Sequence, residues 1–202
     1  GCESLQSITI PNSVTKLGGE VFYGCKSLKS IVIPDSVTSI GAEVFGNCTN
    51  LEKFEGKFAS EDGRCLVIDG ALSAFAPAGI TEYTIPDNVT SIKTYAFRDC
   101  TSIERVTIPD TVTSMERYAF SGCSNLVSAT LGNGIAVLET CLFYLCSSLE
   151  SITIPEGVTT LGNHSFYSCK SLKEITIPAG VTSIGKSAFA YCSNLANVYC
   201  QA

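Results

Sequence analysis

The chain of 202 residues is poor in the groups that most binding and catalytic sites need. It has no tryptophan, one methionine, one histidine, and 13 basic residues against 19 acidic ones, which gives a net charge of −6. Nucleic-acid binders gather Lys and Arg on one face, so this composition argues against a nucleic-acid partner. No apolar stretch approaches the roughly 18 residues of a membrane-spanning helix, and we expect no membrane insertion.

Catalytic motifs are also missing. The single histidine, His164, stands beside Ser165 in a slot where the other repeats carry unrelated residues, which favours an exposed imidazole over a general base. The many serines include no GxSxG nucleophile elbow. Carboxylates such as Glu104 and Glu150 recur singly at even spacing, which is typical of a solvated face and not of a paired acid and base. The sequence therefore predicts neither an enzyme nor a cofactor site.

What the chain does have is a cysteine at a fixed interval. Eight of its 11 cysteines lie 23 residues apart, except for one gap of 52 residues, which is two periods plus six. A residue that returns every twenty-odd positions marks a solenoid, in which each repeat is one coil and equivalent positions stack. The ladder consists of Cys2, Cys25, Cys48, Cys100, Cys123, Cys146, Cys169 and Cys192.

The repeat unit reads CxSLxxIxIPxxVTxIGxxAFxx, and residues 169–191 match it at every specified position. It resembles the BspA-like, Treponema pallidum type of leucine-rich repeat, whose consensus carries the same IP, VT, IG and AF pairs. Copies of the unit cover almost the whole chain. We therefore predict one leucine-rich-repeat domain over residues 1–202, a fragment of a longer array because neither end carries a polar cap.

The unit also predicts its own local structure. In its first half apolar residues alternate with polar ones, as Ile8 and Ile10 do on either side of Thr9, which indicates a short strand with one buried face. The following VTxIG piece favours a second short strand, and GxxAFxxC favours a single helical or 3₁₀ turn. The predicted fold class is thus an α+β solenoid: a right-handed coil of 23-residue repeats, with a parallel sheet on one face and short helical turns.

Three interpretations of the cysteines compete. An odd count leaves room for a disulfide network with one spare thiol, and many thiols suggest zinc. The zinc interpretation fails because no CxxC pair exists. Equivalent side chains in stacked coils point in parallel, which disfavours disulfides, so we favour reduced, buried thiols that cap backbone groups in the turns.

The pattern breaks between residues 56 and 79. Asp69 and Gly70 stand between two apolar runs there, and a two-residue Asp-Gly linker is a strong hairpin signal. We expect residues 65–68 and 71–75 to pair antiparallel. This interruption either shields or bends the stack, or projects a contact for a ligand.

Tyrosines are the candidate ligand-binding residues. Tyr23, Tyr144 and Tyr167 directly follow the closing Phe of their repeats, and Tyr191 lies one place further on. Exposed tyrosines anchor protein partners or stack on sugars. The alternative is that they pack on the neighbouring coil.

The family resemblance implies a secreted or surface-attached bacterial protein, hence an extracellular or cell-surface location. It also implies a recognition or adhesion module that binds a host or bacterial surface protein or glycan, and we expect this module to be non-catalytic and monomeric. The periodicity itself indicates only an extended scaffold, so a purely structural spacer that displays another domain is the alternative.

Overall fold

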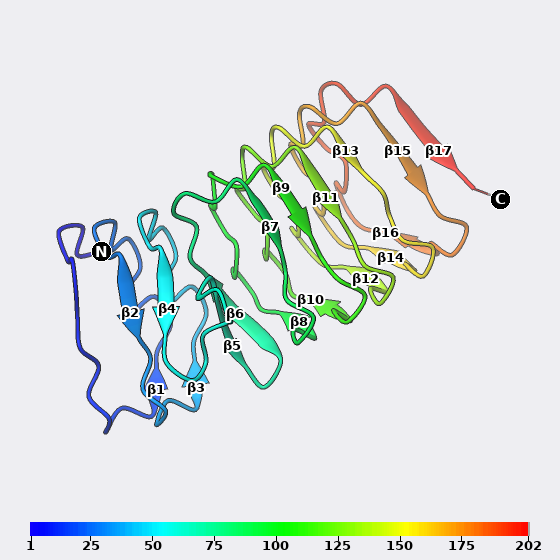
Figure 1. Ribbon diagram of the computed structural model, residues 1–202. Coiled ribbons are helices and arrows are strands. Elements are labelled where there is room, and N and C mark those ends of the chain that lie inside the picture. Colours follow the sequence, from blue (N-terminus) through cyan, green and yellow to red (C-terminus); the bar gives the residue numbers. More distant parts are fainter. Residues whose placement is uncertain (202) are drawn as a thin grey trace.

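Each repeat forms one coil of a solenoid in the computed structural model, which describes residues 1–201. The coils lie side by side from the N-terminus to the C-terminus (Figure 1). We number them from the ladder position: coils 1 to 8 begin at residues 2, 25, 48, 77, 100, 123, 146 and 169, and a partial ninth coil begins at residue 192.

One face of the solenoid is formed by the first strands of coils 2 to 9, and we call it the first-strand face; the strand expected around Ile8 in coil 1 does not form, and Ile8 is exposed. The strands of this face pair in parallel at a separation of 23 residues, as Arg105 and Ser128 do. The strands are β2 (Ser30–Val32), β4 (Lys53–Glu55), β7 (Glu82–Thr84), β9 (Arg105–Thr107), β11 (Ser128–Thr130), β13 (Ser151–Ile152), β15 (Glu174–Ile177) and β17 (Asn197–Cys200).

The predicted second strand is also present, and it is two residues long in coils 1, 2 and 4 to 8. These strands form the second-strand face, again by parallel pairing, as between Thr160 and Ser183. They are β1 (Lys16–Leu17), β3 (Ser39–Ile40), β8 (Ser91–Ile92), β10 (Ser114–Met115), β12 (Val137–Leu138), β14 (Thr160–Leu161) and β16 (Ser183–Ile184).

The hairpin is confirmed with the expected bounds. β5 (Cys65–Ile68) pairs antiparallel with β6 (Ala71–Phe75), and Asp69 and Gly70 form the turn, both with positive φ. β6 also pairs in parallel with β8, so the hairpin supplies the second strand of coil 3. It lies between coils 1–2 and coils 4–8 (Figure 1).

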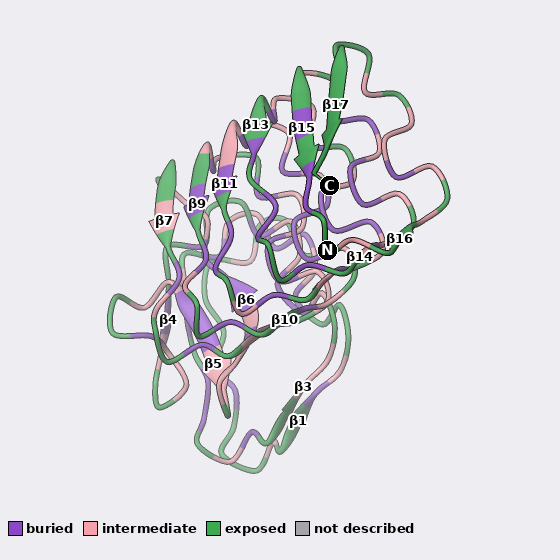
Figure 2. Ribbon diagram, turned by 90° about the vertical axis from the view of Figure 1, so that its right-hand side faces the viewer, coloured by how far each residue is buried: buried purple, intermediate pink, exposed green. Residues whose placement is uncertain are grey.

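The apolar core fills the inside of the coils and is divided in two by the hairpin. Buried stretches face inward along the whole solenoid (Figure 2). Leu66, Ala74 and Ala76 pack with the cluster of coils 1–3, whereas Leu72 and Phe75 pack with the larger cluster of coils 4–8. β6 therefore contacts both clusters, and its pairing with β5 is irregular between Leu72 and Ala74, where the side of the strand that faces each cluster changes.

The predicted α+β class is wrong, because the GxxAFxxC segments do not form helical turns. Residues 1–201 contain strands, turns and bends but no α or 3₁₀ helix, and hence no helix that could cross a membrane. The molecule is a β-solenoid with parallel sheets. The third face consists of turn segments centred on Phe22, Phe45, Phe97, Phe120, Phe143, Phe166 and Phe189, and we call it the turn face.

The backbone of the turn face explains why no helix forms. In a helix the amide groups bond within the segment, but here the amide of Phe120 donates to the carbonyl of Leu142 in the next coil, at 3.1 Å. The residues two before and two after each central Phe have positive φ, for example 60° at Tyr118 and 76° at Gly122. Left-handed residues interrupt a right-handed helix.

Substituting Leu145 with glycine tests this backbone. Leu145 is exposed and has a φ of 61°, in the slot that holds Gly24 and Gly122 in other coils. Removal of its Cβ relieves left-handed strain, so we expect Leu145→Gly to raise the free energy of unfolding by about 0.5–1 kcal/mol. A helical turn would instead be weakened by about 1 kcal/mol. Urea denaturation measures the sign of this change in the free energy of unfolding, and a clear decrease would contradict the left-handed backbone of the turn.

Candidate functional site

Three of the four candidate tyrosines meet on the turn face of coils 6 to 8. The rings of Tyr144 and Tyr167 stack at 4.9 Å between centroids with 16° between their planes. Tyr191 tilts against Tyr167 at 5.0 Å and is 70% exposed. His164 meets Tyr167 edge-on at 5.4 Å. We call Tyr144, Tyr167 and Tyr191 the tyrosine cluster.

Tyr23 does not join them. It lies in coil 1, at the other end of the solenoid, and is half-buried. A Cβ on Gly46, the equivalent position in coil 2, would lie 2.8 Å from the Tyr23 ring. The ring therefore occupies space that glycine leaves open on the neighbouring coil, which is the packing role considered for these tyrosines.

A second aromatic pair was missed. Tyr95 and Tyr118 lie on the turn face of coils 4 and 5, with centroids 5.3 Å apart, and the Arg98 guanidinium lies 4.9 Å from the Tyr95 ring centre. Both stand two residues before the central Phe, at positive φ. Their recurrence in one slot of adjacent coils was visible in the sequence. Together with the tyrosine cluster they place aromatic side chains on the turns of coils 4 to 8.

Two buried polar atoms beside the cluster have no hydrogen-bond partner within residues 1–201. They are Nδ1 of His164 and Oγ of Ser165. Ser165 is fully buried and stands in the slot of Ala96, Ala119 and Ala188. A buried hydroxyl without a partner lowers stability by about 1–3 kcal/mol. The turn that contains Ser165 is therefore less stable than the turns with alanine in the same slot.

The cysteine ladder fixes the register of the coils. The thiol of Cys123 donates to the carbonyl of Phe97 in the preceding layer at 3.1 Å, and Cys146 does the same to Phe120 at 3.2 Å. Cys48, Cys169 and Cys192 repeat this bond. All eleven cysteines are free, and six of the eight ladder positions are buried; Cys2 is exposed and Cys192 partly so. Five of the eight ladder thiols therefore cap a turn carbonyl.

The buried thiols of Cys48 and Cys123 are poorly suited to nucleophilic attack or metal binding. Burial raises the pKa of Cys48 to about 11 and that of Cys123 to about 12, and the thiolate is the reactive and metal-binding form. Over residues 1–201 no group of three or more His, Cys, Asp or Glu side chains is arranged to hold a metal. The ladder is a structural feature.

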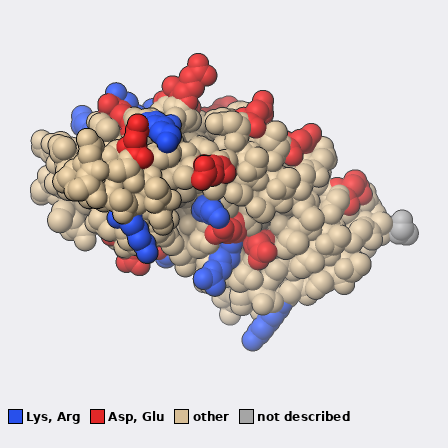
Figure 3. Space-filling model, turned by 90° about the horizontal axis from the view of Figure 1, so that it is seen from below, with Lys and Arg blue, Asp and Glu red and all other residues tan. Residues whose placement is uncertain are grey.

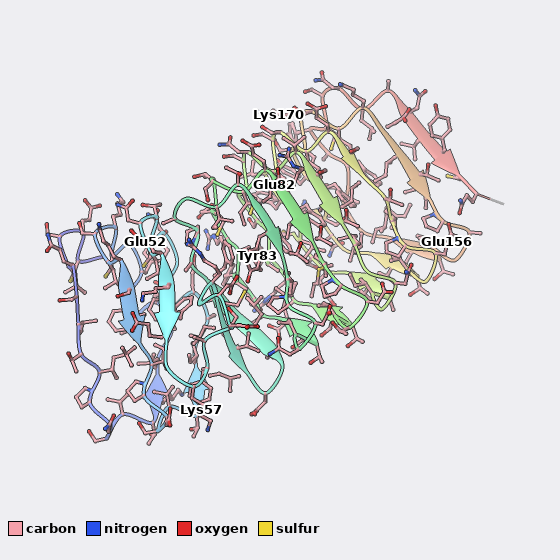
Figure 4. All side chains as sticks on the ribbon, viewed as in Figure 1. Glu52, Lys57, Glu82, Tyr83, Glu156 and Lys170 are labelled. Carbon is pink, nitrogen blue, oxygen red and sulfur yellow. The ribbon has the colours of Figure 1, made fainter. Side chains whose placement is uncertain are left out.

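A small polar network lies at the base of the hairpin. The Cys65 sulfur is 3.2 Å from the Tyr83 hydroxyl, and Ser60 donates to Asp62 at 2.6 Å. Burial raises the pKa of Tyr83, whose side chain lies beside the hairpin (Figure 4). Burial also raises the pKa of Asp62, but hydrogen bonds from Ser60 and from the Arg64 amide outweigh it, and the net shift is downward. The network holds the hairpin against β7.

Charged side chains are spread along the solenoid. Acidic and basic groups are intermixed in the view from below (Figure 3). Ion pairs join equivalent positions of adjacent coils, such as Lys93 with Glu116 at 2.9 Å. Exposed pairs of this kind contribute about 0–1 kcal/mol each. The ion pair of Glu43 with Arg98, at 2.7 Å, differs from these because it joins two coils that are not adjacent, coils 2 and 4, across the hairpin.

The fold and the stacked ladders define a leucine-rich-repeat solenoid. The model of the BspA type leucine-rich repeat region matches residues 1–60 and 71–196 in six copies. The chain belongs to this family. The resemblance inferred from the repeat unit is thus confirmed, and the gap in the match falls within the hairpin segment. No curated protein sequence matches the chain.

Solved structures agree with this assignment. A leucine rich cell surface protein from Faecalibacterium prausnitzii is 32% identical, with a TM-score of 0.84 over 98% of this chain and 54% of that protein. The chain thus spans about half of that relative. The Treponema pallidum leucine-rich repeat protein is 28% identical, with a TM-score of 0.62 over 72% of this chain and 70% of its own. A Bacteroides ovatus leucine-rich repeat protein is 26% identical, with a TM-score of 0.61 over 98% and 67%.

Proposed function

We propose that the chain is a non-catalytic recognition module of a bacterial surface protein, and that it binds a protein partner through the tyrosine cluster. The observation that carries this proposal is the stacked group of Tyr144, Tyr167 and Tyr191 on the turn face, in which Tyr191 is exposed and the other two rings are half-buried. Exposed aromatic groups on a rigid scaffold anchor protein partners because they bury much area at little entropic cost. The description of the Faecalibacterium relative as a cell surface protein supports the location.

Ring geometry favours a protein over a glycan. A sugar stacks on a free aromatic face, but Tyr144 and Tyr167 turn their faces on each other at 4.9 Å. Tyr191 is the most exposed of the three rings, whereas Tyr144 and Tyr167 are half-buried. The exposed charged residues near the cluster are Lys170 and Lys186 of coil 8 and Glu139 of coil 6. A protein surface with apolar side chains and charges of both signs fits this combination.

A double substitution tests the proposal. We expect the chain to retain a matrix or cell-surface protein on a binding array, and Tyr144→Ala with Tyr167→Ala to weaken that binding by tenfold or more, since two central aromatic anchors contribute about 2 kcal/mol each. Tyr23→Ala is the matched control, because Tyr23 has the same slot and is equally half-buried but lies in coil 1, away from the tyrosine cluster. Binding that the double variant retains, or binding to glycans alone, would contradict the proposal.

The spacer alternative makes the opposite prediction. A scaffold that only displays another domain tolerates loss of the tyrosines and of one complete 23-residue coil. Removal of residues 134–156 keeps the ladder in register, because equivalent positions stack at that period. It also removes Tyr144. Unchanged attachment of the full-length protein after this deletion would favour the spacer.

A further inference from the structure

The turn face carries a third ladder of backbone hydrogen bonds, and all of its bonds point the same way. In coil 1 the amides of Glu20, Phe22 and Gly24 donate to carbonyls of coil 2 at 3.1, 2.9 and 2.8 Å. Phe143 and Leu145 of coil 6 donate to coil 7 in the same manner. Each turn thus presents donors toward the C-terminal side and acceptors toward the N-terminal side.

This ladder is missing one turn. In coil 3, Leu72 occupies the position of Ile92, yet only five residues separate it from Pro77, whereas eight separate Ile92 from the equivalent Cys100. The chain is too short there to form a turn segment. Coils 2 and 4 therefore flank an empty layer of the turn face.

The backbone groups on both sides of this layer have no partner within residues 1–201. On the coil 2 side they are the amides of Glu43, Phe45 and Asn47. Glu43 and Asn47 have φ values of 60° and 55°, as in the other coils, so these amides are held in the donating direction. On the coil 4 side the unpartnered groups are the carbonyls of Thr94, Ala96 and Arg98.

The missing layer leaves a notch in the turn face, and residues of β6 form the floor of this notch. Phe75 of β6 lies beneath it and stacks on Phe97 at 4.7 Å, so the aromatic slot of the missing turn is already filled. Ser73, Ala74 and Pro77 complete the floor, and the free protein leaves a cavity of only about 20 Å³ there, so a bound segment has to displace the side chains of Glu43 and Arg98. The Glu43–Arg98 ion pair spans the notch.

We propose that this notch binds a peptide segment of a partner protein, which takes the place of the missing turn. The carbonyls of the segment accept from Glu43, Phe45 and Asn47, and its amides donate to the carbonyls of coil 4. A polypeptide backbone is the ligand that carries acceptors along one edge and donors along the other. This site is separate from the tyrosine cluster and does not depend on it.

The walls also specify the sequence of the segment. Left-handed residues stand two before and two after the centre of every turn, and glycine adopts that conformation without strain. The inward slot is occupied by Phe75, so the central residue must be small. The segment should read Gly-x-Ala-x-Gly or close to it.

Amide hydrogen exchange of the free protein is the first test. Because Glu43, Phe45 and Asn47 lack acceptors, their amides should exchange faster by about tenfold or more than those of Glu20 and Phe22, which occupy equivalent slots one coil earlier. Equal protection at the two sets of amides would overturn the proposal, because it would mean that the notch is already closed.

Peptide binding is the second test, with the synthetic peptide TGAAAGT as the probe. At about ten times its Kd the peptide should slow exchange at the three amides about tenfold. A peptide N-methylated at the central alanine lacks the middle donor and should fail, as should a peptide with central phenylalanine. Ser73→Phe fills the notch floor and should abolish protection of these amides by TGAAAGT. No protection by TGAAAGT at about 5 mM, or equal protection by the N-methylated peptide, would overturn the proposal.

Discussion

Replacing Phe143 with alanine is expected to lower the free energy of unfolding by about 3–5 kcal/mol. Phe143 is fully buried, and its ring stacks between those of Phe120 and Phe166, at 5.6 Å from each. The substitution removes both ring contacts and leaves a cavity that two neighbouring coils cannot close. Urea denaturation followed by circular dichroism measures the loss as a shift of the midpoint at constant slope.

Phe189→Ala is the matched control for this experiment. It has the same slot in coil 8, but it is only partly buried and stacks on one ring, Phe166 at 5.5 Å. We expect it to lose less than half as much stability as Phe143→Ala. Equal losses at the two positions would contradict the view that stacked aromatic rings on both sides hold the coils together.

Much of this scaffold could be predicted from the sequence, because its signals are local or periodic. Alternation of apolar residues predicts the first strands, and the interval between ladder cysteines predicts which strands pair. The hairpin was predicted to the residue since Asp69 and Gly70 specify a two-residue turn without help from the rest of the chain. The turn geometry was not predictable in this way.

The helical turn was a wrong prediction, because the hydrogen bonds that replace the helical ones are made to the neighbouring coil and not within the segment. The Ala-Phe pair of the repeat unit lies four and three residues before the ladder cysteine, which is the spacing of one helical turn. Only the neighbouring coil offers the amides of this segment a better acceptor. One signal was available: the slot two residues after the central Phe holds Gly24, Asn47, Asp99 and Gly122. Glycine, asparagine and aspartate are the residues that best tolerate left-handed backbone.

The candidate site was predicted in part for the same reason. Tyr144 and Tyr167 fall in one slot of adjacent coils, so their contact follows from the period. Tyr191 reaches them from a different slot, and Tyr23 has the right slot in a distant coil. The notch was beyond prediction, since it depends on how the hairpin shortens the turn of coil 3.

The hairpin is also where the solenoid should come apart first. Between other coils at least one ladder continues: the turn ladder joins coil 5 to coil 6 even where β10 and β12 share no bonds, through the amide of Phe120 for example. No single ladder runs from coil 2 to coil 4: the first-strand ladder ends at β4, the second-strand ladder ends at β3 and resumes at β6, and the turn ladder lacks the layer of coil 3. In a linear array the weakest interface between neighbours decides where cooperativity breaks.

Replacing Phe75 with alanine should therefore divide unfolding into two steps. Phe75 is buried, its ring contacts Phe97 at 4.7 Å and Tyr83 at 4.8 Å, and its strand touches both core clusters. Removal of the ring weakens the junction by about 3–5 kcal/mol. We expect residues 1–54 to unfold at a lower urea concentration than residues 80–201. Hydrogen exchange of the whole variant, measured on the proteolytic peptides that cover each part, reports this difference.

Phe143→Ala provides the comparison, because that site lies inside the larger cluster and leaves the junction intact. It should lower the midpoint of coils 4 to 8 without separating coils 1 and 2 from the hairpin earlier. If exchange in Phe75→Ala rises at one urea concentration in all coils, the hairpin joins the two clusters as firmly as any repeat interface. Two separated transitions would instead make it a joint between two rigid stacks, with the peptide notch on the turn face of that same joint.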